Sequence, residues 1–450
     1  MTTDERERAA EDDETGFPRA LWERLEEHPP PPRALFAGRL WRSPIRGPWL
    51  TSVFASVLLA GLPIVIITGF LSYDAYQPQF AGNAFPRGVG LLHFPSFPWP
   101  ANPAWLYRLT QGLHVAVGFA IIPVVLAKLW SVIPRLFIWP PARSIAQVLE
   151  RVSLFFLVGG ILFELVTGVM NTQYWYTFKF DFYTAHYYGA WVFSVAFVVH
   201  VGLKLPTMLR SLRSRRLRDE LRTPLAETVP EPPDVDGLVA LEPAAPTMSR
   251  RGALALVGGG SLVVTAVTLG ETLGDGVRST ALLSVRGRNY GAGSGDFQVN
   301  RTAAGARIDP AAVGAGWRLT LPGARPVVLT RDQLLAMPQH TARLPIACVE
   351  GWSTVQTWTG VRLRDLAALA GVTDVDRATV RSLERSGSFA TVVLNHHQVA
   401  AGDALLALKV NGIDLPMDHG YPARAIIPAA PGVHNTKWVR EIEFVPRSPA

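Results

Sequence analysis

Residues 344–366 read LPIACVEGWSTVQTWTGVRLRDL and contain Cys348, the only cysteine among the 450 residues. A single thiol cannot form a disulfide within its own chain. Cys348 is therefore either an ordinary buried cysteine or a thiolate with a chemical task. One cysteine also means that no disulfide framework holds this region together.

Around this stretch, residues 275–450 alternate short β-rich runs with turn signals. WRLTL, ATVVL and EIEFV read as strands, and LPGARP and HGYP read as turns. TRDQLLAM and RLRDLAALAG carry a helical pattern. About 175 residues of this texture can bury a proper core, so we expect a soluble α+β domain here.

The part of the chain before this domain gathers its apolar residues into long runs. Hydrophobic residues make up 48% of the chain and charged residues 18%, and such clustering marks a membrane protein. We expect a multi-domain chain with an N-terminal all-α transmembrane helical bundle of four helices, a fifth membrane helix and the C-terminal α+β domain. The predicted spans are 47–73, 109–127, 152–170, 187–203 and 252–270.

Composition sets the boundaries of these parts. Residues 1–45 begin acidic and become Pro-rich, which is typical of a disordered tail. The four-helix membrane domain covers 46–206 and a Pro-rich linker covers 207–250. The fifth helix covers 251–272, and the soluble domain covers 275–450.

Basic residues indicate how the chain lies in the membrane. The net charge is +7, but Lys and Arg concentrate in short segments beside the apolar runs, so the charge indicates orientation rather than nucleic-acid binding. The segments before the first span, between the second and third, and after the fourth are basic. We therefore expect a multi-pass protein of a bacterial cell membrane, with the tail and linker in the cytoplasm and the C-terminal domain on the extracytoplasmic side.

The fifth span has two interpretations. Residues 247–270, TMSRRGALALVGGGSLVVTAVTLG, place Arg250 and Arg251 before a moderately apolar, Gly-rich run. This order resembles a twin-arginine export signal, a route that moves folded domains with their cofactor already loaded. The alternative is a plain membrane helix with two positive-inside arginines.

Histidines open two of the predicted spans. His114 begins the second span and His186 the fourth, both at the outer face, so their side chains are expected at similar depth. Two imidazoles at one depth can take both axial positions of a haem iron. The alternative is a pair of interfacial histidines that reach water. His200 lies 14 residues after His186, on nearly the same helix face, and His93 in an outer loop is expected to be unliganded.

This histidine pattern resembles the four-helix cytochrome b subunits of formate dehydrogenases and hydrogenases. The resemblance implies one haem b near the outer face, held by His114 and His186. A second haem would use His200, but the first span has no histidine to pair with it, so the second haem stays open. Glu164 in the third span is either a proton acceptor for a quinol or a neutral, hydrogen-bonded side chain.

Residues 344–366 together with 410–444, VNGIDLPMDHGYPARAIIPAAPGVHNTKWVREIEF, resemble the molybdopterin-binding domain of the sulfite oxidase family. The style is that of bacterial catalytic subunits that reduce sulfoxides. The resemblance implies that Cys348 is the protein ligand of molybdenum, with Glu350 near the metal. A polarizable thiolate suits a soft metal site. Little chain follows EIEFV, so we expect no vertebrate-type dimerisation domain and a monomeric catalytic domain.

The same resemblance implies residues that hold the pterin. Arg424 supplies a fork of donors and Lys437 a point charge for the terminal phosphate. The implied cofactor-binding residues are Asn300, Asn411, His419, Arg424, Thr436 and Lys437. His396 and His397 are read as adjacent strand residues that point to opposite faces, which favours a structural or surface role over a metal site.

Together these features predict a membrane-bound molybdenum enzyme. We expect oxygen-atom transfer outside the membrane, on a small-molecule substrate with a transferable oxygen atom. Electrons would pass through the b-type haem to or from quinone or a soluble carrier. Two alternatives stay open: a sulfite-type dehydrogenase that runs in the oxidising direction, and a non-catalytic pterin-binding domain on a cytochrome b anchor.

Overall fold

The computed structural model describes residues 40–83, 96–136, 145–234, 237–240, 242–285, 289–323 and 326–448. The chain divides into two compact units. The helical unit comprises 1–63, 118–168 and 186–264, and the mixed unit comprises 64–117, 169–185 and 265–450. Residues 1–39 of the predicted tail and His93 lie outside the described residues. Residues 40–45, also assigned to that tail, form turns that bury Ile45.

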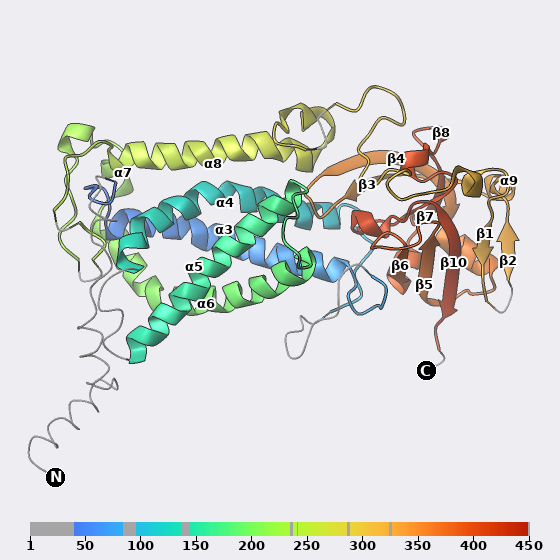
Figure 1. Ribbon diagram of the computed structural model, residues 1–450, viewed down its shortest axis with the longest axis horizontal. Helices are drawn as coiled ribbons and strands as arrows, with labels where there is room; N and C mark the ends of the chain where they lie inside the picture. Colours follow the sequence, from blue (N-terminus) through green and yellow to red (C-terminus); the bar gives the residue numbers. More distant parts are fainter. Residues whose placement is uncertain are drawn as a thin grey trace, which may run out of the picture. The chain divides into compact units, whose positions relative to one another are not determined.

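Five long helices account for the apolar runs (Figure 1). Each is long and apolar enough to cross a membrane, with a mean hydropathy of 1.7 to 2.4 in its most apolar window. Only 6% to 28% of each window is buried, so most of these apolar side chains face away from the protein. The helices are α3 (Pro48–Ala75), α4 (Leu106–Leu136), α5 (Ile145–Thr172), α6 (Phe182–Ser214) and α8 (Arg250–Leu273).

The predicted linker is more ordered than its composition indicates. Helix α6 continues to Ser214, and a short helix α7 (Leu217–Glu220) and a 3-10 turn η2 (Leu225–Glu227) follow. The Glu220 carboxylate lies 2.6 Å from the Arg215 guanidinium and 3.3 Å from that of Arg250. Paired charges of this kind hold the described part of the stretch against the helical unit, which a free linker would not allow.

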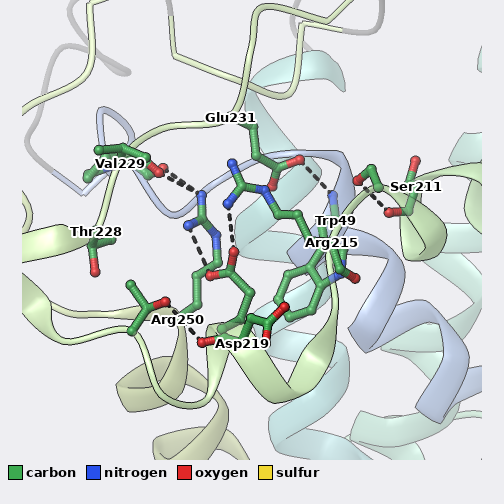
Figure 2. A network of polar contacts seen from close by, with 12 residues as sticks. Trp49, Ser211, Arg215, Asp219, Thr228, Val229, Glu231 and Arg250 are labelled. Carbon is green, nitrogen blue, oxygen red and sulfur yellow. Dashed lines mark hydrogen bonds and ion pairs between the residues drawn. The ribbon is translucent and has the colours of Figure 1, made fainter.

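The two arginines at the start of α8 differ in their surroundings. Arg250 is 2% exposed and donates to the carbonyl oxygens of Val229 at 3.0 Å and Pro44 at 3.4 Å. Figure 2 shows its side chain among those of Arg215 and Glu231. Arg251 is exposed. Arg250 therefore has a structural role within the helical unit.

Two sheets build the C-terminal domain within the mixed unit (Figure 1). The first has the order β2-β1-β10-β5-β6, and only the β1–β10 pairing is parallel. The second has the order β3-β4-β7-β8, with β9 also pairing with β7. The strands are β1 (Leu319–Leu321), β2 (Val327–Leu329), β3 (His340–Ala347), β4 (Ser353–Arg362), β5 (Val375–Ser382), β6 (Thr391–Asn395), β7 (Leu405–Val410), β8 (Ile413–Asp414), β9 (Arg424–Ile426) and β10 (Val439–Pro446).

Short helices connect these strands. The predicted helical stretches form α9 (Arg331–Ala336) and α10 (Leu363–Leu369), which confirms both. A third helix, α11 (His396–Ala400), follows β6. The 3-10 turns are η3 (Asp275–Thr280), η4 (Pro310–Val313), η5 (Met417–His419) and η6 (Gly432–His434).

The prediction that His396 and His397 lie on a strand is wrong. The Asn395 side chain accepts a hydrogen bond from the Gln398 backbone, and the Gln398 side chain accepts one from the Asn395 backbone, each at 3.0 Å. This capping box ends the strand and starts α11 at His396. The two histidine rings lie 3.8 Å apart instead of on opposite faces.

Candidate active site

Cys348 lies in the loop between β3 and β4. Its backbone N–H donates to the Trp352 carbonyl, and the Gly351 N–H donates to the Cys348 carbonyl, both at 3.0 Å. Gly351 has a φ of 97°, a left-handed conformation that favours glycine and lets the loop turn this tightly. The Cys348 side chain is buried, so the loop presents its thiol to the protein interior.

The second sequence motif meets the thiol from the other side. Pro431 forms an isolated parallel bridge with Ala347. A Cβ built on Gly432 would lie 3.5 Å from the Cys348 Sγ and 3.1 Å from the Ala347 carbonyl oxygen. The absence of a side chain at Gly432 thus allows the segment before Thr436 and Lys437 to approach Cys348.

Arg424, the first residue of β9, is a buried cation within electrostatic range of this thiol. Its guanidinium donates to the backbone carbonyls of Asn435 and His419, each at 3.3 Å, and lies over the Trp358 ring at 5.4 Å. Burial lowers the pKa of Arg424 to about 9, and the Cys348 thiol acts in the opposite direction. Among the described residues no carboxylate pairs with Arg424, so an anion would complete its surroundings.

His419 and Lys437 come together with Arg424 around Gly420. Gly420 has a φ of 108°, and a Cβ there would lie 3.1 Å from the Lys437 Cβ and 3.2 Å from the Arg424 Cβ. The His419 ring stacks on Phe297 with centroids 3.6 Å apart, and its Nε2 contacts the Gly295 carbonyl at 3.0 Å. Burial, with Arg424 and Lys437 adding to it, lowers the pKa of His419 to about 3, so this ring is neutral.

Lys437 connects this cluster to the segment that contains Asn300. Its Nζ donates to the carbonyl oxygens of Asp418 at 2.6 Å and Arg301 at 2.8 Å. Asn300, the residue before Arg301, is half-buried in a bend. The structure therefore places the Asn300 segment beside Lys437.

Asn411 uses its amide within the protein. It has a φ of 51° in the turn between β7 and β8, accepts from the Thr357 N–H at 3.0 Å, and donates to the Ser294 carbonyl and the Gln356 side chain at 2.8 Å each. These contacts support a role for Asn411 in holding the loop around the site, whereas the resemblance implies a cofactor-binding residue.

Residues 307–450 match the family described as the oxidoreductase molybdopterin binding domain. The C-terminal domain is therefore a molybdopterin-binding oxidoreductase domain, similar to those of the sulfite oxidase family. An uncharacterized oxidoreductase YuiH from Bacillus subtilis is 32% identical over 131 residues, covering 28% of this chain and 65% of that protein. NADH nitrate reductase from Volvox carteri is 32% identical over 148 residues, covering 26% of this chain and 17% of that one.

Mitochondrial sulfite oxidase from Mus musculus is 28% identical over 147 residues, covering 27% of each chain. The chain thus spans between 17% and 65% of the lengths of these three relatives. These matches cover 26% to 28% of this chain, so they describe the C-terminal domain. The role of the membrane helices depends on their own residues.

Several polar atoms of the C-terminal domain fit a bound pterin. The buried side chains with a polar atom that makes no hydrogen bond with described residues include Gln298 (both amide atoms), Trp352 (Nε1), His419 (Nδ1) and Thr436 (Oγ1). Buried polar groups rarely remain unsatisfied, so such atoms indicate an absent partner. Gln298 and Phe297 also line a polar cavity of about 840 Å³ in the mixed unit. This set suits a polar, multiply hydrogen-bonded cofactor.

Sequence reasoning missed three tyrosines near Cys348. Tyr76 follows α3, Tyr107 lies in the first turn of α4, and Tyr183 lies in the first turn of α6, all within the mixed unit. The hydroxyls of Tyr76 and Tyr107 lie 3.4 Å apart, and the Tyr76 ring is 5.7 Å from that of His434. Burial raises the pKa of Tyr76, and Tyr107, Tyr183 and Cys348 raise it further, so Tyr76 is a neutral phenol. From sequence these aromatics read as an interfacial belt.

Glu350, two residues after Cys348, is half-buried in the same loop. It lies within electrostatic range of Tyr107 and Tyr183. This carboxylate is therefore near enough to the two phenols to influence their ionisation.

His114 and His186 each have an acceptor at Nδ1. In the mixed unit, His114 Nδ1 lies 2.9 Å from the Val65 carbonyl oxygen. In the helical unit, His186 Nδ1 lies 2.9 Å from the Thr167 hydroxyl and 3.1 Å from the Glu164 carboxylate. A partner at Nδ1 leaves the lone pair on Nε2, which is the usual arrangement of a metal-binding histidine.

His200 has a different environment within the helical unit. It lines a largely apolar cavity of about 220 Å³ together with Lys128, Glu150 and Lys204. Glu150 and Lys204 form an ion pair at 2.9 Å. The surroundings of His200 do not decide whether a second haem binds there, so the second haem stays an open prediction.

Proposed function

We propose that this chain is a membrane-bound, molybdopterin-dependent oxidoreductase that performs oxygen-atom transfer on a small molecule. The observation that carries the proposal is the buried Arg424 guanidinium, which lies within electrostatic range of the buried Cys348 thiol and has no carboxylate partner among the described residues. Burying a lone cation is costly, so a site of this kind suits an anionic cofactor.

Each side chain of the site has a task toward that cofactor. Cys348 would bind molybdenum through its sulfur, and Arg424 with Lys437 would hold the pterin phosphate. The Thr436 hydroxyl and the neutral His419 ring would hydrogen-bond the pterin, with the Asn300 segment alongside. When bound, the cofactor supplies two-electron oxygen-atom transfer. In the reducing direction, an oxide takes up two electrons and two protons and yields the reduced substrate and water.

Glu350 is proposed to transfer protons between water and the substrate at this site. Its carboxylate is half-buried, near the phenols of Tyr107 and Tyr183 and two residues from Cys348. A carboxylate at the edge of a closed site can pass protons between water and the substrate oxygen.

The membrane helices are proposed to carry electrons through a b-type haem. His114 and His186 are the proposed axial ligands. Each has a polar partner at Nδ1, which suits each ring, taken by itself, to bind a metal through Nε2. Gly69 leaves room for His114, since a Cβ there would lie 2.9 Å from the ring. Glu164 would orient His186 through its contact at 3.1 Å.

The electrons would go to or come from quinone or a soluble carrier. The five apolar helices and the distribution of basic residues support a multi-pass protein of a bacterial membrane. The same distribution supports an extracytoplasmic position for the C-terminal domain.

A second candidate is the same site run in the oxidising direction, as a sulfite-type dehydrogenase. Similarity to mitochondrial sulfite oxidase favours it, and similarity to nitrate reductase favours reduction. The contacts around Cys348 serve either direction. A domain that only binds pterin is disfavoured, because Cys348, Arg424 and Lys437 are all present and brought together.

The test is a substrate screen on the purified full chain, followed by haem absorbance. We expect the purified protein to contain molybdenum and haem b in stoichiometric amounts. A substrate with a transferable oxygen atom should oxidise the reduced haem. If the protein is instead a sulfite-type dehydrogenase, sulfite should reduce the oxidised haem. Protein from tungstate-grown cells is the control and should keep its haem and lose turnover. Purified protein without molybdenum would contradict the proposal. A full low-spin haem signal after His114→Ala with His186→Ala would refute the haem ligands.

A further inference from the structure

The loop that carries Cys348 is held by the helical segments of the mixed unit. Gln111 Nε2 donates to the Val349 carbonyl oxygen at 2.8 Å, and Asn171 Nδ2 donates to the same oxygen at 3.4 Å. Arg108 Nε donates to the Ser353 hydroxyl at 3.0 Å. A Cβ on Gly351 would lie 2.8 Å from Val115, so backbone and helix touch directly. The ends of α4 and α5 therefore form part of the surroundings of Cys348.

The three tyrosines come from the same region of the mixed unit. Tyr76 is 2% exposed and Tyr107 is 1% exposed. The Tyr76 ring lies 6.2 Å from those of both Tyr107 and Tyr183, so one ring joins the other two. The Tyr76 ring also lies 5.7 Å from the ring of His434, two residues after Gly432, where a Cβ would lie 3.5 Å from the Cys348 sulfur. Buried phenols in contact at this place are an expensive arrangement for a purely apolar packing role.

A cluster of neutral phenols has a definite chemistry. Each hydroxyl donates one hydrogen bond without adding charge, and each ring excludes water. Donors fixed in a closed site orient an incoming oxygen atom at no cost of rearrangement. Arg424 lies on β9, where the cofactor phosphate is expected, whereas the tyrosines lie at the helix ends that meet the Cys348 loop, which leaves their side for the substrate.

We propose that Tyr76, Tyr107 and Tyr183 form the substrate-facing wall of the Cys348 site, and that their hydroxyls position the oxygen atom to be transferred. The proposal rests on the proposed function, because it needs a substrate at Cys348. It assigns positioning residues to the ends of helices that lie outside the matched domain, residues 307–450.

The first test removes single hydroxyls from the full chain by Tyr76→Phe and Tyr107→Phe. Loss of one hydrogen bond to the substrate oxygen should lower kcat/KM about fivefold, with molybdenum and haem content unchanged. Tyr188→Phe is the matched control, because Tyr188 lies five residues after Tyr183 on α6 and so on another helix face. Wild-type kinetic constants in both Phe variants would overturn the positioning role.

The second test uses Cys348 as its own reporter, since no other thiol competes for an alkylating reagent. In protein from molybdenum-starved cells, Tyr107→Ala should speed iodoacetamide labelling severalfold, whereas Tyr107→Phe and Tyr188→Phe should label like wild type. Unchanged labelling in Tyr107→Ala would show that the phenol does not cover the thiol. This readout needs no turnover, so it stands even if the screen finds no molybdenum and the proposed function fails.

Discussion

Gln111 on α4 donates a hydrogen bond of 2.8 Å to the carbonyl of Val349, the residue directly after Cys348. A helix that is apolar enough to span a membrane is thus bonded to the loop that bears the proposed metal ligand. His114, the proposed haem ligand, lies three residues further along α4. The position of the Cys348 loop is therefore set by the same helix that carries His114.

Gln111→Leu should loosen the Cys348 loop. The variant leaves the Val349 carbonyl with only the longer contact from Asn171, at a cost of about 1 kcal/mol for a lost hydrogen bond. We expect hydrogen exchange in the peptide containing residues 348–353 to accelerate about fivefold. Gln173→Leu is the control, because Gln173 contacts Leu283 instead. Equal exchange in the Gln111 variant and wild type would show that this bond does not hold the loop.

Arg424→Lys should impair retention of the cofactor. A lysine cannot reproduce the guanidinium fork that reaches two carbonyls and lies over Trp358. We expect the pterin retained after prolonged dialysis to fall about tenfold, equivalent to about 1.4 kcal/mol. Arg440→Lys, at an exposed arginine that donates to the Ser382 carbonyl, should retain pterin like wild type. Full retention in Arg424→Lys would remove this residue from the phosphate site.

Most of the secondary structure could be predicted from the sequence, because helices and strands depend on the local periodicity of apolar residues. The runs WRLTL, ATVVL and EIEFV overlap β1, β6 and β10, and the apolar runs coincide with the long helices. The error at His396 and His397 came from Asn395, whose side chain caps a helix where the β-rich run before it indicated a strand. A cap formed by one side chain outweighed the strand propensity of its neighbours.

The site was predictable only where it is contiguous in sequence. Cys348 and Arg424 stand in recognisable strings, so their roles could be inferred before their contacts were known. Tyr76, Tyr107 and Tyr183 could not, because their place beside the thiol depends on which helix ends meet the loop, a non-local relationship. The periodicity and spacing of residues along the sequence do not predict such non-local contacts.

Acidification should destabilise the mixed unit through His434. Burial lowers the pKa of His434 to about 3 from an ordinary value of 6.5. Below about pH 6.5 His434 binds a proton in the unfolded chain but stays neutral in the folded chain. The free energy of unfolding therefore decreases as the pH falls. At pH 5 this one group costs about 2 kcal/mol.

The measurement is urea unfolding of the solubilised protein at pH 7 and pH 5, followed by tryptophan fluorescence. His434→Gln should lose about 2 kcal/mol less than wild type between the two pH values. An equal loss in both proteins would mean that His434 does not carry this pH dependence.

Arg251→Lys is the clean test of the export signal. Arg250 cannot serve, because its bonds to Glu220 and two carbonyls mean that Arg250→Lys should itself lower the free energy of unfolding by about 1–3 kcal/mol. Arg251 is exposed, so its replacement keeps charge and structure. If a receptor reads both arginines, protease added to spheroplasts should no longer cleave residues 275–450 in Arg251→Lys. Cleavage as in wild type would indicate that the arginines act only as charge.

The most direct test of the account is turnover by Cys348→Ser. A hydroxyl is a poor substitute for a thiolate at a soft metal site, so the variant should keep the wild-type haem spectrum and lose turnover. The rate is measured as substrate-driven change in haem absorbance, on protein whose molybdenum content has been determined. Turnover close to wild type in a molybdenum-loaded Cys348→Ser protein would contradict the assignment of Cys348 as the metal ligand.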